Sequence, residues 1–410
     1  MVNHTVNIIK EYTFKISLYL FLIVSVLFVI SIIIYYIEQF FKKIKSLKEK
    51  KYFDFLYSYF FGKCDLNEVT KKKLKKSILT DIFSRVIPLV TGDKQLRLKK
   101  AVKDLALIEV ITKNLHSIFP SKRIRACYLL GVLGLREHAK LLVPTLHDPH
   151  PRVVSSAIIA LGELKEESTV PEILSIFPFC TEAHAWLISA ILPFFGPGIY
   201  KYIKPYMKIG SLPDNRLVLL IKVVSNLQIS ESVKDLVPIF LQASNLNVKI
   251  NALIAIGKIN DLSSVKIVLN ALEDKNWQVR AVAANIIGDM ALKGAIYRLI
   301  PLLNDKNWFV RKNSATAIAK MGKLGIYTLI QHMDQKDKYA RDMIVQTLEE
   351  LGIVDRAIKD LKSNNPKTRE DAKYILKILA ENGYTKYLEN FIEHEEEIRH
   401  LLDERMRAEA

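Results

Sequence analysis

Two identical stretches decide the fold, Asp274-Lys275-Asn276-Trp277 and Asp305-Lys306-Asn307-Trp308, which lie 31 residues apart. Each is soon followed by an apolar–basic pair, Val279-Arg280 in the first case and Val310-Arg311 in the second. A fixed period of this length indicates stacked copies of one supersecondary unit. Arrays of such units form long binding surfaces more often than active sites.

One unit can be followed along residues 295–322. We predict a first helix over 295–303, a turn over 304–307 and a second helix over 308–321, because apolar residues recur at helical spacing. Asp305 stands in the turn, where a carboxylate can accept backbone N–H groups at the start of the next helix. Gly322 is expected to end the second helix in a left-handed conformation.

The apolar–basic pair recurs along the chain, at Ile124-Arg125, Val248-Lys249, Val279-Arg280, Val310-Arg311, Ala340-Arg341 and Thr368-Arg369. This pattern resembles HEAT repeats and, more loosely, the HEAT-like repeats of bacterial phycobilin lyases. The resemblance covers about 101–381, or roughly nine units of this period, and implies an all-α solenoid. Units near 180–206 and 213–224 depart from it, because prolines interrupt the first and Val218 takes the basic position in the second.

Trp277 and Trp308 begin second helices beside Lys275 and Lys306. The resemblance implies that second helices line the concave surface of the array. These four residues are therefore candidate anchors for a partner, because tryptophan is common among the residues that dominate binding energy. The alternative is that the tryptophans pack between neighbouring repeats.

Arg280 and Arg311 belong to a ladder of basic residues with two alternative roles. One role is to bind an acidic ligand. The other, which the resemblance implies, is to bridge neighbouring repeats, often by contact with the turn aspartate. The same ladder would include Arg125, Lys249, Arg341 and Arg369.

Residues 16–37 contain no charge, glycine or proline. A helix of this length would reach about 33 Å, enough to cross a hydrocarbon core of roughly 30 Å. We therefore predict one transmembrane helix in the inner membrane, preceded by a short extracytoplasmic segment over 1–15. Because lysines are denser after the run than before it, the N-terminus should lie outside and the repeats in the cytoplasm.

The connector over 38–100 is basic and aromatic. The segment 42–103 holds 18 lysines and arginines against 6 acidic residues, a large part of the net charge of +17. Such clusters attract anionic lipid, and nucleic acid is a less favoured partner. The candidate membrane-surface residues are Lys42, Lys43, Lys45, Lys71, Lys72, Lys73, Lys75 and Lys76. The acidic end over 382–410 is expected to form a capping helix or, alternatively, a docking tail.

No catalytic motif stands out in the sequence, and we predict neither cofactor nor metal. His147, Asp148 and His150 hint at a metal site, although Asp148 is explained as a turn residue. The three cysteines are widely spaced and form no disulfide framework. The buried, structural interpretation is favoured for Cys127 and Cys180.

These observations favour a non-enzymatic scaffold or adaptor, anchored in a bacterial membrane, whose solenoid binds a partner protein. An envelope or polysaccharide-synthesis complex is one setting suggested by analogy with membrane-anchored bacterial proteins of this kind. Enzymatic alternatives follow from the resemblance, since similar arrays occur in phycobilin lyases and DNA glycosylases. A further alternative is binding of nucleic acid or anionic lipid through the connector.

Overall fold

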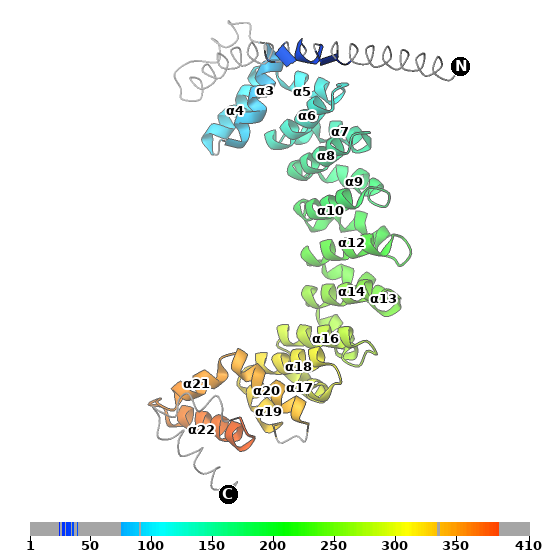
Figure 1. The fold of residues 1–410 in the computed structure, drawn as a ribbon. Coiled ribbons are helices and arrows are strands. Elements are labelled where there is room, and N and C mark those ends of the chain that lie inside the picture. Colours follow the sequence, from blue (N-terminus) through cyan, green and yellow to red (C-terminus); the bar gives the residue numbers. More distant parts are fainter. Residues whose placement is uncertain are drawn as a thin grey trace, which may run out of the picture. The chain divides into compact units, whose positions relative to one another are not determined.

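The computed structural model of the chain describes residues 75–89, 92–333 and 337–384, together with residues 24, 27, 28, 30–33, 35, 36 and 39. The chain divides into two compact units, Met1–Leu164 and Lys165–Ala410. In both units the described residues form helices and turns, and no strand is found among them (Figure 1). The predicted all-α solenoid of HEAT-like hairpins is confirmed.

In the first unit α5 packs on α6, and α6 packs on α8. Helix α3 contacts both α5 and α6. The α-helices are α3 (Lys76–Val86), α4 (Asp93–Asp104), α5 (Ile108–Leu115), α6 (Pro120–Leu133), α7 (Ala139–Leu142) and α8 (Pro151–Leu164). The 3-10 helices are η1 (Ile87–Leu89), η2 (Arg136–His138) and η3 (Val143–His147).

In the second unit the longer helices α10, α12, α14, α16 and α18 pack one on the next. Its α-helices are α9 (Val170–Ile176), α10 (Glu182–Ile191), α11 (Tyr200–Ile203), α12 (Asp214–Asn226), α13 (Val233–Gln242), α14 (Leu246–Ile259), α15 (Val265–Ala271), α16 (Trp277–Asp289), α17 (Ile296–Leu299), α18 (Trp308–Lys320), α19 (Lys323–Gln331), α20 (Lys338–Glu350), α21 (Ile353–Asp360) and α22 (Pro366–Glu381). Its 3-10 helices are η4 (Glu167–Thr169), η5 (Leu192–Phe195), η6 (Pro197–Ile199), η7 (Lys204–Tyr206), η8 (Ser230–Ser232), η9 (Leu262–Ser264), η10 (Lys293–Ala295) and η11 (Ile300–Asn304).

Several hairpins have a first helix that changes from α to 3-10 geometry at a proline. The helix predicted over 295–303 is divided in this way, because α17 ends at Leu299 and η11 carries Pro301 near its start. Proline lacks the N–H that would continue the α-helical ladder. Pro144 in η3 and Pro205 in η7 occupy the same place in their hairpins. The second helix predicted over 308–321 is α18.

Small residues bring the successive second helices α16 and α18 close together. Val279 and Val310 are fully buried, and Ala317 is almost fully buried. A Cβ atom placed on Gly288 of α16 would lie 2.7 Å from the Cα atom of Ala317 in α18. The backbones of the two helices therefore leave no room for a side chain at this crossing.

The end of α18 differs in detail from the prediction. Gly322 has a φ of +77°, so a residue with a side chain would be disfavoured there. Its ψ of −147° places it outside the left-handed helical region, and it serves as the N-cap of α19. The glycine therefore redirects the chain between two helices. The capping helix predicted over 382–410 lies almost entirely outside the described residues, which end at 384.

The prediction of a single-pass membrane protein with cytoplasmic repeats is wrong. Within the described part of the chain, no helix is both long enough and apolar enough to cross a bilayer. Of the run 16–37, the described residues are 24, 27, 28, 30–33, 35 and 36. The physical requirement is one continuous helix of about 20 apolar residues, whereas an apolar run in sequence specifies composition alone.

Replacing Gly288 with alanine should destabilise the second unit by about 1–3 kcal/mol, because the added methyl group meets backbone rather than a mobile side chain. This loss outweighs the gain in helix propensity of about 1 kcal/mol. Urea denaturation followed by circular dichroism measures the change. Gly294→Ala is the control, since nothing lies within 4 Å of its new Cβ atom. An equal effect in both variants would contradict the close crossing.

Candidate functional site

A basic residue occupies the same position in six of the second helices, four residues after the N-cap. The N-caps are Phe119, Asn245, Asn276, Asn307, Asp337 and Asn365. The corresponding basic residues are Arg123, Lys249, Arg280, Arg311, Arg341 and Arg369. This common position defines the ladder in the folded chain.

Arg280 joins two successive turns. Its Nε and Nη2 donate to Asp305 Oδ2 and Oδ1 at 2.8 and 2.9 Å. Its Nη1 donates to the carbonyl oxygen of Asp274 at 2.8 Å. Asp274 belongs to the turn before α16, and Asp305 belongs to the turn before α18. One guanidinium group therefore fixes the start of its own helix against the next hairpin.

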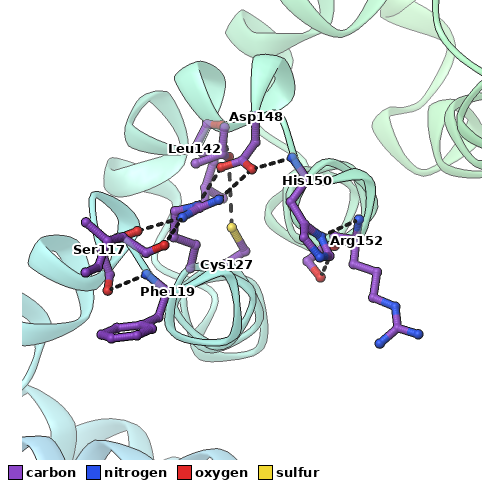
Figure 2. Close-up of polar contacts among 11 residues, drawn as sticks. Ser117, Phe119, Cys127, Leu142, Asp148, His150 and Arg152 are labelled. Carbon is purple, nitrogen blue, oxygen red and sulfur yellow. Dashed lines mark hydrogen bonds and ion pairs between the residues drawn. The ribbon is translucent and has the colours of Figure 1, made fainter. Parts of the chain in front are cut away.

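Arg123 repeats this geometry in the first unit, where it joins Ser117 and Asp148, two residues that Figure 2 labels. Its Nε and Nη2 donate to the Asp148 carboxylate at 2.6 and 2.8 Å, and its Nη1 donates to the carbonyl oxygen of Ser117 at 2.7 Å. Lys249 reaches Asp274 Oδ2 at 2.6 Å with its single ammonium group. In all three pairs the carboxylate follows the cation by 25 residues.

The sequence pattern assigned the first ladder position to Arg125, and this assignment is wrong. Arg125 pairs instead with Asp81 of α3. The pattern of an apolar residue followed by a basic one selected Arg125, but the neighbouring basic residue Arg123 faces the turn. The 25-residue spacing to Asp148, shared by the pairs 249–274 and 280–305, is the sequence signal that identifies Arg123.

The turn aspartates serve two structures at once. Asp305 Oδ1 accepts the backbone N–H of Asn307 at 2.8 Å, which confirms its expected place in the turn. Burial of Asp305 acts to raise its pKa, but hydrogen bonds from Arg280 and from Asn307 more than offset this and lower the pKa below its ordinary value. The pKa values of Asp148 and Asp274 are lowered by equivalent contacts against the same opposing effect of burial.

Among the described residues, no carboxylate holds Arg311 in this way. Its Nη1 donates to the carbonyl oxygens of Asp305 at 2.8 Å and Lys306 at 3.4 Å, which matches the inner half of the Arg280 arrangement. Its Nε is buried without a hydrogen-bond partner. Its guanidinium carbon instead lies 5.6 Å from the ring centre of Tyr339 in α20.

The two predicted tryptophans are brought into one cluster by Phe309, a residue that the sequence analysis missed. Trp277 stacks on Phe309 with ring centres 5.4 Å apart, and Trp308 meets the same ring edge-on at 5.0 Å. Trp277 is half-buried, so it shares in the packing between repeats. The exposed fractions are 44% for Trp308, 53% for Phe309 and 69% for Tyr339. We call these four residues, at the starts of α16, α18 and α20, the aromatic edge.

The lysines of the sequence prediction fall into two groups. Lys275 and Lys306 are exposed beside the aromatic edge. Of the candidate membrane-surface residues, Lys75 and Lys76 are described and exposed. The other six, Lys42, Lys43, Lys45, Lys71, Lys72 and Lys73, lie outside the described residues.

Comparison with known protein families identifies similar repeats in this chain. The family pattern described as HEAT repeats matches residues 108–178, 233–319 and 265–349. Within these segments the chain is similar to HEAT repeats. No curated protein matches its sequence.

Solved structures of similar fold include Kap121p, with a TM-score of 0.46 and 12% identity over 79% of this chain and 43% of that chain. Human deoxyhypusine hydroxylase has a TM-score of 0.26 and 16% identity, over 67% of this chain and 96% of that chain. The CpcE–CpcF complex of phycocyanin lyase from Nostoc sp. PCC7120 has a TM-score of 0.29 and 16% identity, over 59% of this chain and 94% of that chain. The chain therefore spans less than half the length of Kap121p.

The residues that hinted at a metal form an ordinary turn before α8. Figure 2 shows the Asp148 carboxylate engaged on one side and directed on the other toward His150, whose backbone N–H it accepts at 2.8 Å. His150 Nδ1 accepts the backbone N–H of Arg152 at 3.3 Å. Across the described residues, no group of three or more histidine, cysteine or acidic side chains is placed to hold a metal ion. Burial raises the pKa of the Cys127 thiol to about 11, and Cys180 is half-buried.

Replacing Arg123 with glutamine should lower the urea midpoint of unfolding more than Arg125→Gln does. Arg123 and Asp148 are 12% and 8% exposed, whereas Arg125 and Asp81 are 32% and 24% exposed. The first change leaves a poorly hydrated carboxylate without its partner, which is the costlier loss. Hydrogen exchange at the start of α6 and in the turn before α8 should rise in Arg123→Gln alone. If Arg125→Gln lowered the urea midpoint more than Arg123→Gln, Arg125 and not Arg123 would be the ladder residue of α6.

The stability of the array should fall in acid because of its turn aspartates. A carboxyl group whose pKa is lowered on folding stabilises the folded chain above its unfolded pKa, about 3.9 for aspartate. This contribution is lost as pH falls through the lower folded value. Between pH 5 and pH 2, Asp274→Asn/Asp305→Asn should therefore lose less stability than the natural chain. Asp289→Asn, which alters an exposed pair with Lys320, should follow the natural chain in urea titrations across the same range.

Proposed function

We propose that this chain is a non-enzymatic scaffold whose HEAT repeats bind a partner protein at the aromatic edge. The observation that carries the proposal is the exposure of Trp308, Phe309 and Tyr339 on the ends of two consecutive second helices. Exposed tryptophan and tyrosine side chains with cations nearby are the residue types that dominate binding energy in protein interfaces. A contiguous apolar patch on a folded surface is typical of an interaction site.

The ion pairs Lys249–Asp274 and Arg280–Asp305 support this role, because they hold the turns that carry the aromatic edge in one conformation. Arg280 fixes the turn that carries Lys275 to the turn that carries Lys306. It donates to the carbonyl oxygen of Lys275 at 3.2 Å and to the carboxylate of Asp305 at 2.8 Å. A surface held in one conformation loses less entropy when a partner binds. Arg280 itself contributes to the proposed site only in this indirect way, because its donors are occupied within the chain.

The proposed site needs only the described repeats of the second unit, within the solenoid expected over 101–381. The suggestion of an envelope or polysaccharide-synthesis complex depended on membrane placement and is not carried forward. The likeness to deoxyhypusine hydroxylase and to phycocyanin lyase concerns the fold, so it favours neither activity for this chain.

Site-specific photo-cross-linking tests the proposal. In the full-length chain expressed in its native cells, a benzophenone amino acid in place of Tyr339 should capture a discrete partner. The same group in place of Tyr297, a 67% exposed residue of α17, should not capture it.

Adding Trp308→Ala should remove the adduct at position 339, because loss of an interface anchor costs about 2 kcal/mol or more. Leu262→Ala, at an 89% exposed residue outside the edge, is the matched control. Unchanged capture after Trp308→Ala in a folded chain would contradict the aromatic edge as the binding site.

A further inference from the structure

The aromatic edge carries cations without acidic partners. Lys275, Lys306 and Lys338 are exposed. Lys275 and Lys306 each lie just before the N-cap of α16 or α18, and Lys338 is the first residue of α20. Among the described residues, none of the three lies within ion-pair distance of a carboxylate. The nearby Asp274 and Asp305 are 13% and 8% exposed and are held by Lys249 and Arg280. Among the described residues, these three lysines therefore face solvent, while the carboxylates of Asp274 and Asp305 are turned inward.

The remaining acidic groups near the edge do not cancel this charge. Asp337 uses Oδ1 to accept the backbone N–H of Tyr339, as the N-cap of α20. Glu273 pairs with Arg298, 2.9 Å away. Arg311 adds a fourth cation, since no carboxylate lies within hydrogen-bond distance of it in the described chain and its Nε is unpaired.

The chain itself shows which ligand suits these cations. At the two preceding ladder positions, Lys249 and Arg280 each bind an aspartate side chain presented by a neighbouring turn. Arg311 occupies the equivalent position and makes the same inner bonds to carbonyl oxygens. A carboxylate supplied from outside would complete at Arg311 the kind of pair that is internal at Arg280.

Spacing indicates how such carboxylates would be arranged. The lysines occur once per repeat, and packed helices lie about 8–10 Å apart. An extended peptide advances about 3.3 Å per residue, so about three of its residues span one repeat. Acidic side chains at every third position would then meet successive lysines. The intervening residues would lie over Trp308, Phe309 and Tyr339.

We propose that the partner's binding segment is an extended acidic peptide with an acidic residue about every third position and aromatic or apolar residues between. This inference rests on the proposed function and specifies the chemistry of its partner. A single-stranded nucleic acid would need free ring faces on which bases stack. Trp277 and Phe309 instead stack on each other, so the peptide is the better fit.

Fluorescence anisotropy with the full-length chain tests the chemistry directly. The probe is a labelled twelve-residue peptide with the sequence Glu-Phe-Ser repeated four times. Matched probes replace every Glu with Gln or with Lys, or every Phe with Ala. The Glu-Phe-Ser peptide should bind, and each matched probe should bind at least about tenfold more weakly, since several weak contacts are lost together.

Two sets of charge-removing variants locate the site. Lys275→Gln/Lys306→Gln/Lys338→Gln should weaken binding of the Glu-Phe-Ser peptide by about tenfold or more. Lys234→Gln/Lys266→Gln/Lys293→Gln removes the same charge at exposed lysines elsewhere in the unit and should leave affinity nearly unchanged. Equal losses in both variants would mean attraction by net charge alone and would overturn the proposal.

Arg311→Gln and Arg280→Gln form a matched pair at equivalent positions. Arg311→Gln should weaken peptide binding with a small loss of stability, because it breaks bonds to carbonyl oxygens only. Arg280→Gln should cost more stability, because it leaves Asp305 without its partner. Equal peptide affinity in Arg311→Gln and the natural chain would remove Arg311 from the site.

The remaining outcomes separate this inference from the proposed function. Equal binding of the Gln and Glu probes, or no binding of the Glu probe at millimolar peptide, would overturn the proposal that the partner's binding segment is acidic. Tighter binding of a dT12 oligonucleotide that depends on the same three lysines would replace the peptide with nucleic acid. The scaffold proposal stands in the first two cases if Tyr339 cross-linking still captures a protein, and it fails if that capture is also absent.

Discussion

The ion pair between a second helix and the turn of the next hairpin is the constraint on which this array depends. In a repeat protein each unit contacts mainly its neighbours, so register has to be fixed at every junction. Arg280 does this through two parallel bonds to Asp305, a geometry that a planar guanidinium group favours. Because Asp305 also holds the N–H of Asn307, the same carboxylate shapes its own turn and anchors the preceding repeat.

Close crossing of helices is the second requirement of the array. Like the ion pairs, it helps to decide which side chains lie at the surface. Gly288 lies against Ala317 with no space for a side chain, so α16 and α18 meet along their backbones. With the turns fixed by ion pairs and the helix bodies in contact, large rings at the helix starts have little interior volume to enter. Trp308 and Phe309 consequently lie at the surface, where they stack and remain partly exposed.

Much of the fold could be predicted from the sequence, because the repeat period, the turn aspartates and the apolar–basic pairs are local signals. The choice between Arg123 and Arg125 could not be made from the apolar–basic pair, since both lie in the first two turns of α6. Phe309 was overlooked for a similar reason, as it sits next to a more conspicuous tryptophan. The apolar run over 16–37 led to a wrong localisation, because composition does not establish one continuous helix of sufficient length.

The sequence by itself determined a periodic array of helical hairpins, with Asp274 and Asp305 in two of the turns and Arg280 and Arg311 in the helices that follow them. Only the tertiary structure decided which cation meets which carboxylate, and that Arg311 meets none within the described part of the chain. It also decided that Trp277 is half-buried while Trp308 is exposed. The physical reason is that sequence spacing sets where a side chain lies along and around its own helix, whereas its partner is set by how the neighbouring repeat packs against that helix.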